Sequence, residues 1–504
     1  MPEFAHRRAE EWNLCPALVE YIGQDFFDRD FTDNVCELML PEDEKSKERT
    51  ARSFLTRLTI SLGVSVTPCP PDAIRILVKY LHDPDVGPVG RRSITILLRI
   101  IANQNRSEGS AGQGLIPITR SVFSDLVSCF QDFGLTNLPD VYSLMRKNLI
   151  ECFGGLALND RNVQGYSTKD DKVKTMLRWI NAKTSQPDKA ICALVFFGNI
   201  ICKSDEVIVS LIRLKGCQDD STNFPDRLSE IISVLKFGPL LTSALDVVQN
   251  LAARPKKRKT VAEMGILDAL VCCWSIRSTN MQMRCKALYQ TRQLLQLTSD
   301  NVYTFLEKEV DVWDGIGVLP ITILLSSREQ ADYFPLRVEI GRTLAEIWRT
   351  AHSFVSISKD ASESALEDLL IPVRSMTVSE IVETNTAQEM SPRSVLAAIA
   401  RATSMHADIA EPLIDLIRSQ NASLVTEGWF GMALMAKEKY GACRVHDSLY
   451  KFDALDTFRS TLHAQDGDSK DKANATLLLS NLIDNIVSMC TPCPRSNADL
   501  RCIA

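Results

Sequence analysis

Few residues in this chain have the types and spacing that catalysis or metal binding requires. Six histidines are spread along it with no pair at metal-ligand spacing, and the usual nucleotide-binding, hydrolase and zinc-protease motifs do not occur. Residues 87–93 resemble a phosphate-binding loop only faintly, because they lack its spacing and its lysine. Cys490 and Cys493 form a C-x-x-C pair without a second pair, which indicates tail residues rather than metal ligands. We therefore expect a binding protein that has no catalytic site, metal or cofactor.

The polar residues that stand out are asparagines within apolar segments. Residues 193–200 and 244–251 are two copies of one pattern that begins with Ala-Leu and ends in an asparagine followed by an aliphatic residue. These asparagines are Asn199 and Asn250. A side-chain amide has donors and an acceptor, so it could hold the backbone of an extended partner chain. The alternative is that each asparagine caps its own helix end or the next loop.

Equivalent positions recur along the chain at intervals close to or somewhat above the roughly 40–47 residues of helical repeats. Asp246 lies one helical turn before Asn250, on the same face, and could receive a lysine or arginine of a partner. It could equally be an ordinary solvated charge, and the same holds for Glu346. The candidate partner-binding residues are Asn199, Asp246, Asn250, Gln293, Glu346 and Asn481.

The elements around these residues have the layout of an armadillo repeat: a long helix ending in Asn-Leu-Ala, a polar turn, a short helix, a glycine and an apolar helix. Helical periodicity continues through most of the chain, without strand alternation. In the second half, the pattern predicts helices over residues 240–253, 257–264, 266–276, 281–297, 302–309, 316–325, 336–351, 394–403, 407–419, 424–439, 450–462 and 471–489.

Because no such unit can bury its apolar face alone, the units must stack. We expect an all-α, armadillo/HEAT-like right-handed superhelical solenoid. One domain of about 9–11 units would cover residues 1–490, with an N-terminal cap at 1–40, an irregular insertion at 355–392 and a flexible tail at 491–504.

Composition limits the partner and the compartment. The net charge of −6 argues against a nucleic-acid-binding surface, and no apolar run reaches the roughly 18 residues of a membrane span. Fifteen irregularly spaced cysteines indicate reduced thiols, so we expect a cytoplasmic protein. We also expect a monomer. The basic run at 255–259 (Pro-Lys-Lys-Arg-Lys) is either an import signal, which implies nuclear shuttling, or a solvated helix end.

Several passages resemble a known family. Residues 177–180, 193–199 and 244–252, and the later passages 426–436 and 472–479, are similar to the armadillo-repeat GDP-dissociation stimulators of small GTPases, the SmgGDS type. This resemblance implies binding of Rho-, Rac- or Rap-type GTPases with basic, prenylatable tails, together with stimulated GDP release or chaperoning. It also implies that Asn199 and Asn250 contact the GTPase on the concave face.

The chain departs from the family where Ile100 and Gly155 replace polar residues and where only Asp246 represents the acidic patch expected for a basic tail. The main alternative is an armadillo adaptor or import carrier that binds an extended peptide. Import carriers have a tryptophan one turn before each asparagine, whereas Val195 and Asp246 stand there in this chain. A myosin-type chaperone is a further alternative.

Overall fold

The structure is a computed structural model of the 504-residue chain. It describes isolated positions between 78 and 102 and between 208 and 211, and it describes continuously residues 120–133, 140–157, 171–184, 186–202, 223–276, 279–313, 316–329, 333–357, 391–464 and 470–487. The predicted N-terminal cap, most of the predicted insertion and the predicted tail lie outside these residues.

Contacts between Cα atoms divide the chain into two compact units, Met1–Leu228 and Ser229–Ala504. The described helices of the first unit are α7 (Arg120–Phe133), α8 (Asp140–Ala157), α10 (Asp171–Trp179) and α11 (Pro187–Ile201). Helix α13 (Phe224–Val234) contains the point of division. The two units are described separately below.

The first unit has an aromatic core. Phe123 of α7 stacks on Phe196 of α11 with ring centroids 5.1 Å apart, and Phe153 of α8 meets both rings edge-on. Pro187 begins α11 at a position where its missing N–H costs nothing, and Asp188 in the first turn complements the helix dipole. The apolar stripe of α11 is thus fixed against α7 and α8.

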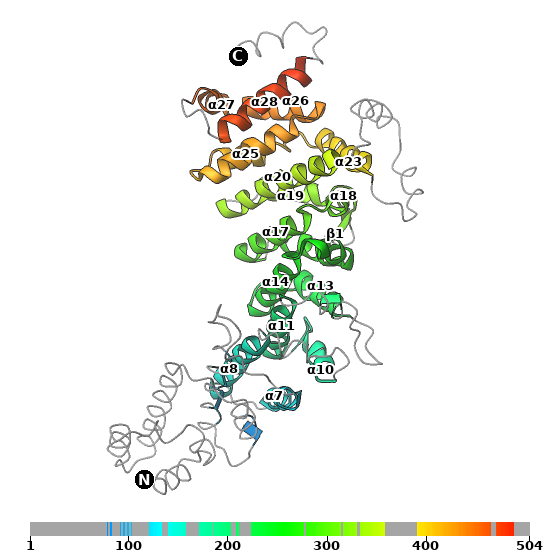
Figure 1. Cartoon of the computed structure of the whole chain (residues 1–504), viewed down its shortest axis with the longest axis vertical. Coiled ribbons are helices and arrows are strands. Elements are labelled where there is room, and N and C mark those ends of the chain that lie inside the picture. Colours follow the sequence, from blue (N-terminus) through cyan, green and yellow to red (C-terminus); the bar gives the residue numbers. More distant parts are fainter. Residues whose placement is uncertain are drawn as a thin grey trace, which may run out of the picture. The chain divides into compact units, whose positions relative to one another are not determined.

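The second unit is a succession of packed helices, drawn in green to red in Figure 1. In chain order they are α14 (Pro239–Ala252), η2 (Pro255–Lys257), α15 (Arg258–Val261), η3 (Ala262–Ile266), α16 (Leu267–Ser275), α17 (Met281–Leu295), α18 (Ser299–Glu307), α19 (Pro320–Glu329), α20 (Phe334–Ile357), α23 (Pro392–Met405), α24 (Glu411–Ile417), α25 (Ala422–Met435), α26 (Lys439–Lys451), α27 (Leu455–Leu462) and α28 (Lys470–Val487).

Five of these helices, α14, α17, α20, α25 and α28, pack one on the next, and we call them the ladder helices (Figure 1). Neighbours run in the same direction: Thr426 near the start of α25 bonds Asp471 near the start of α28, and Ala433 near the end of α25 bonds Asn481 further along α28. Helices α16, α18, α23, α24, α26 and α27 each pack against members of this row. The predicted all-α helical-repeat solenoid is confirmed as a fold class.

The predicted glycine turn before the apolar helix is also present. Gly265 has φ +78°, a conformation that side chains with a Cβ rarely adopt, and it lies just before α16. The turn lets the short helix α15 and the apolar helix α16 take different directions, as the armadillo layout requires.

The helix predicted from residue 316 begins too early. Residues Val310–Trp313 (β1) and Ile316–Val318 (β2) form an antiparallel hairpin in which Val310 pairs with Val318, and α19 starts only at Pro320. The sequence holds Asp314-Gly315 between the two strands, which is a hairpin-turn signal. The prediction also left residues 440–449 unassigned, where the structure has α26.

Candidate functional site

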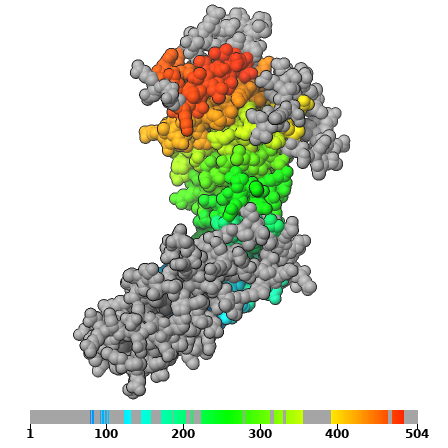
Figure 2. All heavy atoms as spheres, viewed as in Figure 1, coloured from blue at the N-terminus to red at the C-terminus, as the bar shows by residue number. Residues whose placement is uncertain are grey.

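The ladder helices bring together five of the six predicted partner-binding residues. Asp246 and Asn250 lie on α14, Gln293 on α17, Glu346 on α20 and Asn481 on α28. We call the solvent-accessible side chains of these five helices the ladder face. Figure 2 shows that the atoms of this unit pack into a continuous body on the side in view. Asn199 lies in the first unit, on α11.

Asn199 and Asn481 use their amide donors inside the protein. Nδ2 of Asn199 donates to the carbonyl of Gly154 in the last turn of α8 (2.8 Å), and Nδ2 of Asn481 donates to the carbonyl of Ala433 in the last turn of α25 (2.7 Å). Carbonyls in a last helical turn have no partner within their own helix. Each asparagine therefore caps the corresponding helix of the preceding repeat, a role that the sequence did not suggest.

Side-chain bonds to the preceding repeat recur at positions that were not predicted. Asn485 donates to the carbonyl of Ala436 (2.9 Å) and the Thr350 hydroxyl to that of Leu295 (3.2 Å), both at helix ends. Gln290 donates to the carbonyl of Leu245, which lies within α14 and not at its end. Donor and acceptor are separated by 45 to 55 residues, about one repeat. An amide placed one repeat beyond a helix end is the signal that could have identified these caps.

Asn250 and Gln293 are half-buried on the ladder face. The side chain of Gln293 makes no hydrogen bond to any residue that the structure describes. Among the predicted amides, Gln293 is therefore the one whose donors and acceptor are all unused by the described residues.

Asp246 is accessible but paired. Its side chain is 57% exposed, and its carboxylate lies 2.5 Å from Nζ of Lys286 on α17. An exposed ion pair of this kind contributes little to stability and is easily exchanged. A basic side chain of a partner would compete with Lys286 for this carboxylate.

Glu346 is not on the accessible surface. Only 1% of the residue is exposed, and its carboxylate accepts hydrogen bonds from Arg349 (2.5 Å) and Thr350 (3.3 Å). Burial raises the pKa of Glu346, although Arg349 opposes this shift. The Glu346 carboxylate is therefore bonded within α20 and is not accessible for the expected contact with a partner.

Two further acidic residues of the ladder helices are paired. Glu339 pairs with Arg292 (3.1 Å), and Glu427 pairs with Arg342 (3.0 Å). Arg292 is buried and lies over the ring of Tyr289, whereas the accessible Arg349 lies over the ring of Phe430. The described ladder face therefore presents mostly paired charges and one arginine–aromatic stack, with Asp471 and Asp484 of α28 as its unpaired acids.

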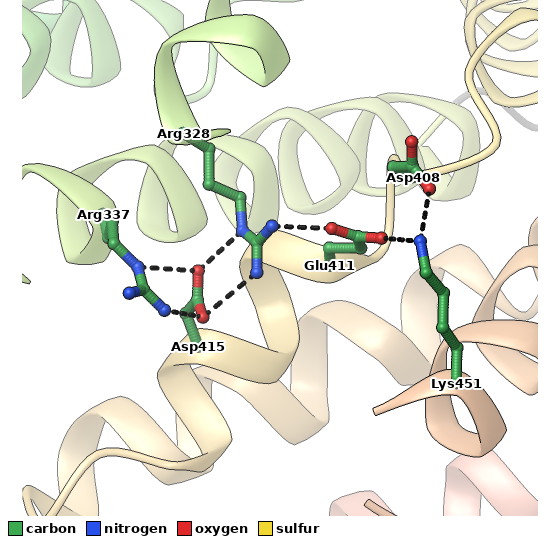
Figure 3. A network of polar contacts seen from close by, with 6 residues as sticks. All are labelled: Arg328, Arg337, Asp408, Glu411, Asp415 and Lys451. Atoms are coloured by element: carbon green, nitrogen blue, oxygen red, sulfur yellow. Dashed lines mark hydrogen bonds and ion pairs between the residues drawn. The ribbon is translucent and has the colours of Figure 1, made fainter. Parts of the chain in front are cut away.

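A second polar cluster joins α19, α20, α24 and α26 (Figure 3). Asp415 accepts hydrogen bonds from Arg328 (2.7 Å) and Arg337 (2.5 Å), Arg328 also reaches Glu411 (2.6 Å), and Lys451 bridges Glu411 and Asp408. Burial raises the pKa of Glu411, whereas the hydrogen bond from Lys451 lowers the pKa of Asp408. Three cations balance three carboxylates, so this cluster fits a role in holding helices together.

The basic run at 255–259 is folded rather than extended. Arg258 is buried and donates to the carbonyls of Ala252 and Gln296, both at 2.8 Å, while Lys259 pairs with Asp300. Lys256 and Lys259 are exposed and Lys257 is half-buried, so these three lysines fit the solvated-helix-end interpretation, whereas the buried Arg258 does not.

The described cysteines are free thiols. Burial raises the pKa of Cys152 and of Cys273 to about 12, so both stay protonated and unreactive. In the described part of the chain, no three His, Cys, Asp or Glu side chains are grouped as metal ligands. None of the described helices has the length and apolar character to cross a bilayer.

No protein-family model and no curated protein matches the chain. Solved structures that resemble it include two crystal structures of Uso1. One is 13% identical, covers 86% of this chain and 70% of that chain, and has a TM-score of 0.43. The other is 12% identical and covers 96% and 82%, with a TM-score of 0.42. The crystal structure of an engineered protein is 13% identical and covers 63% and 98%, with a TM-score of 0.39.

Proposed function

We propose that this chain binds small GTPases of the Rho, Rac or Rap type through its ladder face, and that it stimulates GDP release or chaperones them, in the cytoplasm. The observation that supports the proposal is the row of five helices, which presents half-buried amides, the Arg349–Phe430 stack and the exchangeable Asp246–Lys286 ion pair. Arginine and aromatic side chains of this kind carry most of the binding energy in protein interfaces. The resemblance of residues 177–300 and 420–485 to GDP-dissociation stimulators selects the partner class.

Such a function needs no catalytic base. A protein that binds the nucleotide-free GTPase more tightly than the GDP-bound form shifts the equilibrium by that difference, and about 1.4 kcal/mol is a factor of ten. The ladder face has only to distinguish two conformations of one partner. Paired charges that can change partners are suited to this, because they give specificity at little cost in stability.

The peptide-adaptor alternative has less support. Its chemistry depends on a row of free amides that bind a peptide backbone, but Asn199 and Asn481 have their donors in bonds to the preceding repeat. Among the predicted amides, Gln293 is the one with no hydrogen bond to the described protein. A folded partner that contacts a broad face does not need that row.

The test is binding and release with purified GTPases. Wild-type chain should retain nucleotide-free Rho-, Rac- or Rap-type GTPase on beads and accelerate release of a fluorescent GDP analogue. Gln293→Arg should weaken both at least tenfold, since it introduces a large cation beside Arg292 on the ladder face. Thr457→Arg, on the exposed side of α27, is the matched control and should behave as wild type.

The proposal fails if no GTPase of these classes is retained and GDP release is unchanged. If the Gln293→Arg variant binds the GTPase normally, the ladder face is not the binding surface. Full affinity for an isolated tail peptide, with no contribution from the folded GTPase, would favour the adaptor alternative instead.

A further inference from the structure

A pocket of about 720 Å³ opens in the second unit, away from the ladder helices. It lies between the end of α13, the start of α16 and the β1–β2 hairpin. Its polar lining includes Glu230, Asp268, Cys272, Lys308, Glu309 and Asp311. The pocket is open to solvent, and Lys308, Glu309 and Asp311 are exposed in it, so a side chain of a partner could reach them.

The charges in this pocket are not balanced. Lys308 pairs with Asp268 at 2.7 Å, which leaves the carboxylates of Glu230, Glu309 and Asp311 without an ion pair to any described residue. On the ladder helices, Asp246, Glu339 and Glu427 each have an arginine or lysine within 3.1 Å, whereas Asp471 and Asp484 of α28 have no ion pair to a described residue. The pocket differs in gathering three such unpaired carboxylates in one lining.

An independent feature of the lining is the hydroxyl of Ser229. Its Oγ is buried and has no hydrogen-bond partner within the described structure. Buried polar atoms nearly always have a partner, so an unmatched one in a pocket wall indicates a missing polar ligand. The carboxylate of Glu309 lies against Gly317, where there is no side chain to cover it.

We infer that this pocket binds a lysine or arginine side chain from a basic segment of a partner protein. Lysine and arginine carry only donors, and the lining offers unpaired carboxylate acceptors. The inference concerns a different surface from the proposed function and does not require the partner to be a GTPase. Its lining comes from α13, α16 and the β1–β2 hairpin, whereas Asp246 lies on α14.

The first test uses fluorescent oligolysine and oligoarginine peptides with the full-length chain at low ionic strength. Replacing the three unpaired carboxylates (Glu230→Gln, Glu309→Gln, Asp311→Asn) should weaken binding about tenfold, because surface ion pairs are individually weak but add together here. The matched control removes the same charge from exposed sites elsewhere (Asp171→Asn, Asp447→Asn, Asp456→Asn) and should change affinity less than twofold. Equal losses in both triple variants would overturn the inference.

The second test locates the bound peptide by the protection of a cysteine and needs no mutation. Cys272 lines the pocket and is half-buried, and Cys285 and Cys443 are half-buried at other places. Bound peptide should slow alkylation of Cys272 severalfold, measured by mass spectrometry, and leave Cys285 and Cys443 unchanged. Unchanged alkylation of Cys272 at saturating peptide would exclude this pocket.

The third test uses a substitution that should strengthen peptide binding instead of weakening it. Lys308→Gln removes the one cation among the described lining residues, so peptide binding should become severalfold tighter and its salt dependence steeper. Weaker or unchanged binding would contradict the inference. Because all three tests are done without a GTPase, their failure is distinct from a failure of the proposed function.

Discussion

At the scale of single residues, the amides of this chain connect repeats. Asn481 illustrates the role, because its Nδ2 satisfies a carbonyl at the end of α25. Asn481→Ala should lower the free energy of unfolding by about 1 kcal/mol, the usual net value of such a bond. Urea denaturation measures it, with the exposed Ser480→Ala on the same helix as the control. An unchanged midpoint for Asn481→Ala would show that the bond does not contribute.

Glu438 should make stability depend on pH. It lies buried at the turn between α25 and α26, and burial raises the pKa of its carboxyl to about 7. The folded state therefore holds this proton more tightly than the unfolded chain, whose pKa is near 4.5. This contribution to stability is complete below pH 4.5, and it is lost as the pH rises through 7.

Glu438→Gln cannot ionise, so its advantage over wild type should grow from about 0.8 kcal/mol at pH 5 to roughly 3 kcal/mol at pH 8. Denaturation curves at the two pH values measure this difference. Asp456→Asn, at a side chain that is 94% exposed, should show no such trend. A constant difference between Glu438→Gln and wild type at both pH values would contradict the assignment.

At the scale of elements, Arg258 joins the ends of two ladder helices. Its guanidinium donates to the last residue of α14 and to the residue after α17. Arg258→Ala leaves both carbonyls without this donor and should cost about 2 kcal/mol of unfolding free energy. Lys256→Ala, in the same basic run but exposed, should leave the unfolding free energy almost unchanged. Equal losses of unfolding free energy in both variants would mean that the run acts only through its charge.

The elements also show what the sequence could predict. The helices of the ladder follow from apolar periodicity, which is local, and the turn at Gly265 follows from one residue type. Helix α26 was missed because its sequence is mostly polar, with Gly441 near its start. The β1–β2 hairpin was missed because the apolar run after Asp314-Gly315 was read with a helical period only.

The candidate site was harder to predict than the fold. Whether Asn199 or Glu346 is free for a partner depends on residues one repeat away or packed from a neighbouring helix, such as Gly154. Sequence spacing shows that side chains recur on one face, but it does not show which of them already have a partner. The pocket at Glu309 and Asp311 depends on the hairpin, which was not predicted.

At the scale of the whole molecule, a repeat protein is held together by contacts between neighbours, so damage should stay local. The polar cluster of Figure 3 tests this, because Asp415, only 4% exposed, holds Arg328 and Arg337 together. Asp415→Ala leaves two arginines without their shared carboxylate and should cost about 3–5 kcal/mol. Hydrogen exchange should rise in α19, α20, α24 and α26.

The same measurement should find α14 protected as in wild type, since it contacts α17 and not the cluster. Asp408→Ala removes a carboxylate that is half exposed, so it is a control in the same cluster and should raise exchange only slightly. If Asp415→Ala instead raises exchange equally in α14 and in α24, the second unit unfolds as one cooperative body. The ladder face would then respond to a partner as a whole, and not one repeat at a time.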